Sequence, residues 1–164
     1  MREPNYDDAN FALRLYEMRR ETELRKARTM IGNLFGQPWE KVKEVCAYEH
    51  PENAHFRQVI GYWEMAASFV NRGTFHADTY LDTCSEGLFT YAGLLPHLAK
   101  LREANSPRFL IQTETAVSAH PALKERVAMI QKMMAAWAAE EKAKAAAAKP
   151  AKKSATKSLS PARR

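Results

Sequence analysis

Apolar side chains recur every three or four positions along most of the chain, and no segment shows the two-residue alternation of a half-buried strand. Residue types that favour helices, among them Ala, Leu, Glu, Lys, Arg and Met, dominate the same segments. We therefore predict an all-α protein, built as a single bundle of about five to six helices in which the first and the last are long.

The first predicted helix covers residues 6–35, with Asn5 as its N-cap and Gly36 as its terminator. Thirty helical residues span about 45 Å, whereas a compact body of this size is about 40 Å across. Two such helices either lie side by side across the molecule, which we favour, or one protrudes and finds a partner. The side chains expected to face the core are Leu13, Tyr16, Arg20, Leu24, Ala27, Ile31 and Leu34.

Two helices are predicted next. One opens at Pro38, since proline suits the first turn of a helix. The other begins near residue 52 or 53 and ends at Gly73, which can adopt the left-handed conformation of a helix terminus. The expected core-facing side chains are Trp39, Val42 and Val45 in the first of these and Phe56, Val59, Ile60, Trp63, Ala67 and Val70 in the second.

Proline positions divide the second half of the chain. A segment starting at Asp78 is followed by a helix from Ser85 to Leu101, which Pro96 should kink because proline removes one backbone hydrogen bond and clashes with the preceding turn. The sequences NSP and HP then separate a shorter helix from the long last one. That last helix carries a heptad pattern typical of a coiled coil. Its members, a candidate face for a partner helix or for a homodimer, are Leu123, Val127, Ile130, Met134 and Trp137.

The net charge of +6 belongs to the end of the chain. Residues 1–148 contain 19 of the 25 Lys and Arg residues and all 19 Asp and Glu residues, so this part is neutral. We interpret residues 1–148 as the helical domain and residues 149–164 as a disordered tail, because the tail has little apolar surface to offset the entropy of ordering. Its cations are Lys149, Lys152, Lys153, Lys157, Arg163 and Arg164.

The tail has two interpretations. Lysines among alanines and prolines neutralise phosphates without reading bases, and six cations would give a salt slope of about −5 on duplex DNA. The same composition also describes a terminus that only keeps a protein in solution. Composition does not decide between non-specific nucleic-acid binding and this second role.

Glu64 is the one acid in the aromatic-rich stretch GYWEMAASFVNRG. On a helical wheel it shares the face opposite Trp63 with small or polar residues, so we expect water to solvate it, since charged residues are rarely buried. A contact with an arginine of another helix is the alternative. Catalysis by Glu64 ranks below both.

Other candidate chemistry is incomplete. Glu52 and His55 have the spacing of half a di-iron site, yet no second copy exists, so we expect no metal and no cofactor. Cys84 lies near a predicted helix start, where a thiol could be activated, but a structural cysteine is the stronger interpretation. No convergent acid, base and nucleophile appear, which makes a helical-bundle enzyme the least favoured class.

The stretches YWEMAASFVNRGTFHADTY and YAGLLPHLAKLR, with the opening YDDANFALRLYEMRRE, resemble a family of small bacterial all-helical proteins catalogued as a domain of unknown function. The resemblance covers residues 6 to about 105. It implies a helical fold and no activity, because none is established for that family. The matching positions are Trp63, Glu64, Gly73, Asp78, Pro96 and Arg102.

The expected function is therefore a noncatalytic protein-interaction or scaffold module, with the nucleic-acid-associated protein as the alternative. No apolar run approaches the roughly 20 residues needed to span a membrane. The opening residues lack the hydrophobic stretch of a secretory signal, so a cytoplasmic location is expected.

Overall fold

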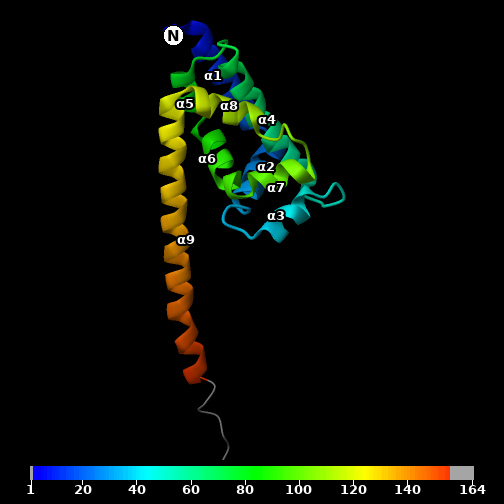
Figure 1. Cartoon of the computed structure of the whole chain (residues 1–164), viewed down its shortest axis with the longest axis vertical. Coiled ribbons are helices and arrows are strands. Elements are labelled where there is room, and N and C mark those ends of the chain that lie inside the picture. The colour runs from blue at the N-terminus through cyan, green and yellow to red at the C-terminus, as the bar shows by residue number, and fades with distance from the viewer. Residues whose placement is uncertain (1, 156–164) are drawn as a thin grey trace, which may run out of the picture. The chain divides into compact units, whose positions relative to one another are not determined.

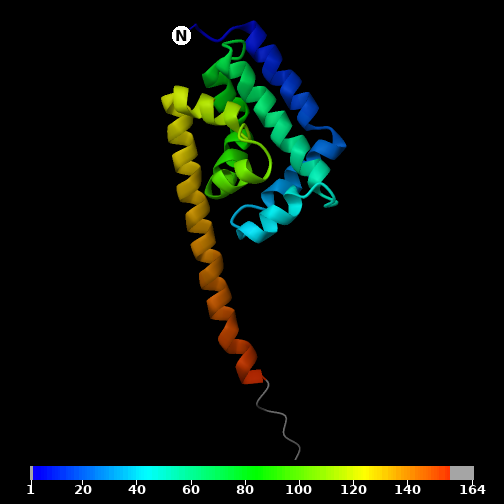
Figure 2. The same cartoon turned by 45° about the vertical axis from the view of Figure 1, so that its right-hand side comes forward.

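The computed structural model describes the backbone of residues 2–155 and the side chains of residues 2–147. Within that part, the chain forms nine α-helices, one short 3-10 helix and no strand (Figure 1, Figure 2). The all-α class is confirmed, but the helices are more numerous than the five to six predicted. The chain divides into two compact units, residues 1–131 and residues 132–164.

The predicted first helix is in fact two, α1 (Tyr6–Arg19) and α2 (Thr22–Gly32). The break lies at Glu21, whose ψ of 141° is not helical and whose carboxylate accepts a hydrogen bond from the Leu24 N–H at 2.8 Å. A side chain that satisfies a backbone donor in the first turn stabilises a new helix start. The prediction of one helix over residues 6–35 was therefore wrong.

The break also changes which side of α1 is buried. Leu13 is 61% exposed, Tyr16 is 51% exposed and Arg20 is exposed, so their predicted place in the core was wrong. Leu15, at 3% exposure, is the buried leucine of α1. The physical reason is that α1 packs mainly against α5 (Ala77–Thr83) whereas α2 packs against α4 (Asn53–Asn71), so one stripe cannot run through both helices. For the second half of residues 6–35, the predicted place in the core is confirmed. The buried side chains there are Leu24, Ala27, Ile31 and Leu34.

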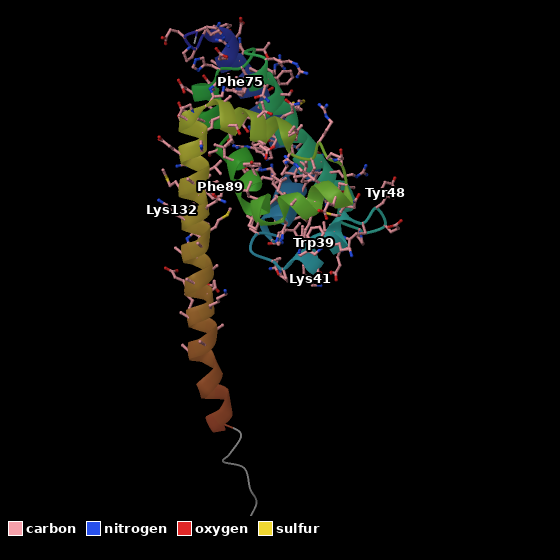
Figure 3. All side chains as sticks on the ribbon, viewed as in Figure 1. Trp39, Lys41, Tyr48, Phe75, Phe89 and Lys132 are labelled. Carbon is pink, nitrogen blue, oxygen red and sulfur yellow. The ribbon has the colours of Figure 1, made fainter. Side chains whose placement is uncertain are left out.

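The central helix is α4, which packs against α2, α8 (Ile111–Ala119) and α3 (Trp39–Cys46). Every residue of its predicted stripe is buried. Its end at Gly73, with φ of +70°, has the predicted left-handed conformation. Between α3 and α4 the exposed Tyr48 lies in a loop that extends away from the helices (Figure 3).

The segment from Ser85 to Leu101 is interrupted where Pro96 was expected to kink it. It consists of α6 (Ser85–Leu94), the 3-10 turn η1 (Leu95–His97) and α7 (Leu98–Ala104). Two buried glycines of α6 allow close packing, because a Cβ at Gly87 would lie 2.8 Å from the Trp63 ring.

The last helix, α9, runs from Pro121 to Ala155 and confirms the predicted long final helix. It continues beyond residue 148, so the proposed tail begins inside α9, and residues 156–164 lie outside the described part. Its first turns belong to the first unit. Its later turns belong to the second unit, where Lys144 and Glu141 form an exposed ion pair of 3.0 Å. Among the described residues, no helix is long and apolar enough to cross a bilayer.

Candidate functional site

A pocket of about 430 Å³ lies between α1, α4 and α5 in the first unit, with Cys84, the N-cap of α6, at its wall. Its size falls within the range of about 300–1,000 Å³ typical of small-molecule sites. Carbon atoms form most of its surface, and Arg19 is the one charged side chain among the described residues that line it. We call it the α1 pocket. Its lining is Ala9, Ala12, Leu13, Leu15, Tyr16, Arg19, Tyr62, Trp63, Thr79, Thr83 and Cys84.

The pocket exists because α1 presents small side chains where it faces α5. Ala9 and Ala12 leave space that a leucine would fill, while Leu13 and Tyr16 form an exposed edge. The phenol of Tyr62 donates a hydrogen bond to the carbonyl oxygen of Leu15, which fixes α4 against α1. Burial raises the pKa of Tyr62 to about 12, so the phenol stays protonated and remains a donor.

Arg19 belongs to a charged group at the edge of the pocket. Arg28 of α2 donates to both carboxylate oxygens of Glu86 of α6, with its Nη2 at 2.6 Å from Oε2. This hydrogen-bonded pairing raises the pKa of Arg28. The Arg19 Nη1 lies 3.6 Å from the same Oε2, and its guanidinium stacks over the Tyr16 ring at 5.0 Å. Two guanidinium groups share one carboxylate, so the trio carries a net charge of +1.

The opposite wall contains Thr79, Thr83 and Cys84. The Thr83 hydroxyl donates to the Thr79 carbonyl oxygen at 2.6 Å. Burial raises the pKa of the Cys84 thiol, so the thiolate needed for nucleophilic attack is disfavoured. The neighbouring imidazoles bind elsewhere: His76 Nε2 lies 2.7 Å from the Arg2 carbonyl oxygen and His97 Nε2 lies 2.9 Å from that of Gln37. The structural interpretation of Cys84 fits its burial.

Glu64 is not solvated as predicted. Its carboxylate accepts hydrogen bonds from the backbone N–H of Gln112 at 2.9 Å and from the backbone N–H and hydroxyl of Thr113 at 2.8 and 2.7 Å. It therefore caps the N-terminus of α8, where Leu110 adopts a φ of +55° and offers no side-chain cap. A carboxylate at a helix N-terminus satisfies unpaired donors and faces the positive end of the dipole. Glu64 is structural, as predicted, but it acts as a helix cap and binds no arginine among the described residues.

Asp8 is a second carboxylate that binds a backbone N–H group from a distant part of the chain. It lies in the first turn of α1, yet it is 0% exposed. Its oxygens accept from the Arg2 guanidinium, with Nη2–Oδ1 at 2.6 Å, from the His76 backbone N–H at 2.7 Å and from the Asn5 backbone N–H at 2.8 Å. The hydrogen bond from Arg2 is the main reason that the pKa of Asp8 lies well below its ordinary value. Asp8 thus ties the N-terminal segment to the start of α5.

Glu52 and His55, the candidate metal ligands from the sequence, do not lie in a common site. His55 Nε2 lies 3.2 Å from Glu23 Oε2, and Glu52 is the exposed N-cap of α4 without a side-chain cap bond. No three His, Cys, Asp or Glu side chains gather as metal ligands in the described part of the chain.

The candidate partner-helix face is divided. Leu123, Val127 and Ile130 are buried in the first unit, so these three are already used within the chain. Trp137, in the second unit, is 52% exposed. Of the candidate nucleic-acid-binding residues, Lys149, Lys152 and Lys153 fall in the final turns of α9, where the side chains are not described. Lys157, Arg163 and Arg164 lie outside the described residues.

The fold and the pocket define an α-helical domain without a recognisable catalytic constellation among its described residues. The family model named Domain of unknown function (DUF4760) matches residues 6–119, from the first turn of α1 to the end of α8. The chain belongs to this family, which confirms the resemblance drawn from the sequence and extends it over α8. Comparison with curated proteins and with solved structures gave no match.

Sequence reasoning missed the α1 pocket. Arg19, Thr79 and Thr83 carried no signal, because each is an ordinary polar residue of an exposed-looking helix. The pair of alanines at positions 9 and 12 was the one available hint, since small residues on a helix face leave room beside it. The two alanines indicate a pocket only when α1 is known to end at Arg19, because that end determines which side of the helix is buried.

Proposed function

We propose that the helical domain is a noncatalytic module that works by contact with a partner protein across α1. The observation that supports this is an exposed apolar face on that helix. Tyr6, at 79% exposure, stands seven and ten positions before Leu13 and Tyr16, so the three side chains share one face. We call these three residues the α1 face. Contiguous exposed apolar surface marks interaction sites in proteins that are otherwise polar outside.

The chemistry of the site agrees with binding. Glu64, the acid that the sequence left open for catalysis, is committed to the cap of α8, and the buried Asp8 is committed to the N-terminal segment. The α1 pocket beside the α1 face offers apolar contact and one guanidinium, a composition suited to recognition.

Site-specific cross-linking tests the contact. A photoreactive benzoylphenylalanine in place of Leu13 should give a discrete cross-linked product in cells, because this position faces outward on the α1 face. The same replacement at Glu40, exposed on α3, is the matched control and should give none. A product of twice the chain mass would identify a second copy as the partner. Equal products at both positions, or none at position 13, would reject the α1 face as the contact surface.

A nucleic-acid role for the chain end is the second candidate, supported by the confinement of the whole net charge to residues 149–164. Removing these residues should abolish binding to duplex DNA, and binding by the full chain should weaken steeply between 50 and 200 mM salt, that is, by about a factor of 10³ for six contacts. Undiminished binding without the tail would exclude this role as stated. A cytoplasmic location stays a prediction from the sequence.

A further inference from the structure

We propose that the α1 pocket binds a small amphiphile that has one apolar body and one carboxylate, with the carboxylate held by Arg19. This site does not depend on the protein contact proposed above, although Leu13 and Tyr16 contribute to both. Its ligand class follows from the apolar lining of the pocket and from the guanidinium of Arg19 at its edge.

The apolar part of the ligand is defined by the walls. Leu15 and Trp63 are buried, at 3% and 1% exposure, and two alanines of α1 complete the surface. Transfer of an apolar chain from water to such a surface is favourable in proportion to the apolar area that is buried. A volume of about 430 Å³ suits a chain of moderate length or a pair of fused rings and is small for a folded partner segment.

The anionic part is defined by Arg19. Arg28 donates to both oxygens of Glu86, whereas the Arg19 Nη1 lies 3.6 Å from Oε2, beyond ordinary hydrogen-bond distance. The Arg19 guanidinium therefore has no hydrogen-bond acceptor among the described residues, and the trio keeps its net charge of +1. A guanidinium presents a planar pair of donors that matches a carboxylate, so a ligand carboxylate would give Arg19 the acceptors that it lacks among the described residues.

The Trp63 side chain also lines the pocket. Its indole Nε1 is fully buried, so the ligand is expected to contact the ring and not this nitrogen. Trp63 is also a natural reporter, because its indole lies in the wall of the pocket.

The experiment uses the full chain with Trp39→Phe and Trp137→Phe, so that Trp63 is the one remaining tryptophan. Decanoate, below its micelle concentration, is titrated against Trp63 emission, and 1-decanol is titrated in parallel as the same apolar body without charge. Decanoate should give a saturable change with one site per chain and should bind about tenfold more tightly than decanol, since a hydrogen bond to a charged group contributes about 1.5 kcal/mol.

Three further variants separate the parts of the site. Arg19→Gln should weaken decanoate about tenfold and leave decanol unchanged, because the amide keeps the polarity but loses the charge. Arg20→Gln removes a neighbouring exposed charge that does not line the pocket. It should change neither the affinity for decanoate nor the affinity for decanol. Ala12→Leu should fill the pocket and abolish both titrations. Circular dichroism of each variant checks that the helices are retained.

Two outcomes overturn the proposal. If decanoate gives no saturable change in Trp63 emission, or if Ala12→Leu leaves the titrations unaltered, the pocket is not the binding site. If decanol binds as tightly as decanoate and Arg19→Gln has no effect, the carboxylate assignment is wrong. Neither result bears on cross-linking at position 13, so failure of this site and failure of the protein contact are told apart.

Discussion

At the scale of single residues, the informative side chains are two carboxylates that bind backbone N–H groups from distant parts of the chain. Glu64 on α4 holds the first turn of α8, and Asp8 on α1 holds the backbone just before α5. The sequence showed both acids but not their partners, which lie 49 and 68 positions away. A buried carboxylate is stable only where such donors converge on it.

Replacing Glu64 by Ala should lower the free energy of unfolding by about 2 kcal/mol, because three donors at the start of α8 lose their acceptor. The matched control is Glu52→Ala. Glu52 occupies the N-cap of α4 but makes no side-chain cap bond, so a change below about 0.5 kcal/mol is expected. Urea unfolding at pH 7 measures both. Equal losses in the two variants would contradict the capping role of Glu64.

Asp8→Asn should remove a pH-dependent part of the stability. Because the hydrogen bond from Arg2 lowers the pKa of Asp8 in the folded chain, the ionised carboxylate stabilises the fold at pH values above its ordinary pKa of 3.8. This stabilisation disappears as the pH falls from about 4 toward the lower folded value. The difference between wild type and Asp8→Asn should thus be largest at pH 7, smaller at pH 3, and should continue to shrink below pH 3 as the folded carboxyl itself is protonated.

Urea unfolding at the two pH values tests this, with Asp7→Asn as the control in the same helical turn. Asp7 is exposed, so its replacement should cost little at either pH. A stability difference for Asp8→Asn that stays constant between pH 7 and pH 3 would show that the charge of Asp8 is not what stabilises the N-terminal segment.

At the scale of elements, α4 matched the sequence because a continuous stripe along its whole length is buried, although several helices cover it. The stripe on α4 and the end at Gly73 could be predicted, since both depend on local spacing and on one backbone conformation. The break between α1 and α2 could not be, because Glu21 is an acceptable helix residue and acts as a cap only where the chain turns. That break created the α1 face and, with it, the α1 pocket.

Two glycines test how closely α6 and α4 pack. Gly87→Ala should cost about 1–3 kcal/mol, since the new Cβ would lie 2.8 Å from Trp63 Cε3 and 2.9 Å from Tyr80 Oη, which belong to buried rings. Gly61→Ala is the control inside α4, where no atom lies within 4 Å of the added carbon. It should gain about 0.5–1 kcal/mol through higher helix propensity. Thermal unfolding of both variants shows whether each substitution raises or lowers the stability. A Gly87→Ala variant that is more stable than the wild type would contradict the close packing of α6 against α4.

At the scale of the whole molecule, the division into two units has a direct consequence for truncation. The first unit contains its own core, including the buried Leu123, Val127 and Ile130 from the start of α9. The second unit continues α9 with alanine, lysine and glutamate, and the described side chains from residue 135 to residue 147 are exposed.

A chain that ends at Gln131 should therefore unfold at the same temperature as the full chain. One that ends at Ala119 loses three buried aliphatic side chains, worth about 5 kcal/mol or more together, and should be largely unfolded. Circular dichroism melts of the two truncations measure this. A chain ending at Gln131 that fails to fold would mean that the first unit depends on the second.

The helical class, the core stripe of α4, the interruption at Pro96 and the separation of the chain's net charge could be predicted, because each follows from local spacing or from composition. The break after α1, the roles of Glu64 and Asp8, and the convergence of Arg19, Tyr62 and Cys84 on one pocket became visible in the folded chain. Helix periodicity says which side chains share a face, but not which face another helix covers. That is fixed by contacts between residues far apart in the chain, whose free energy depends on their arrangement in space.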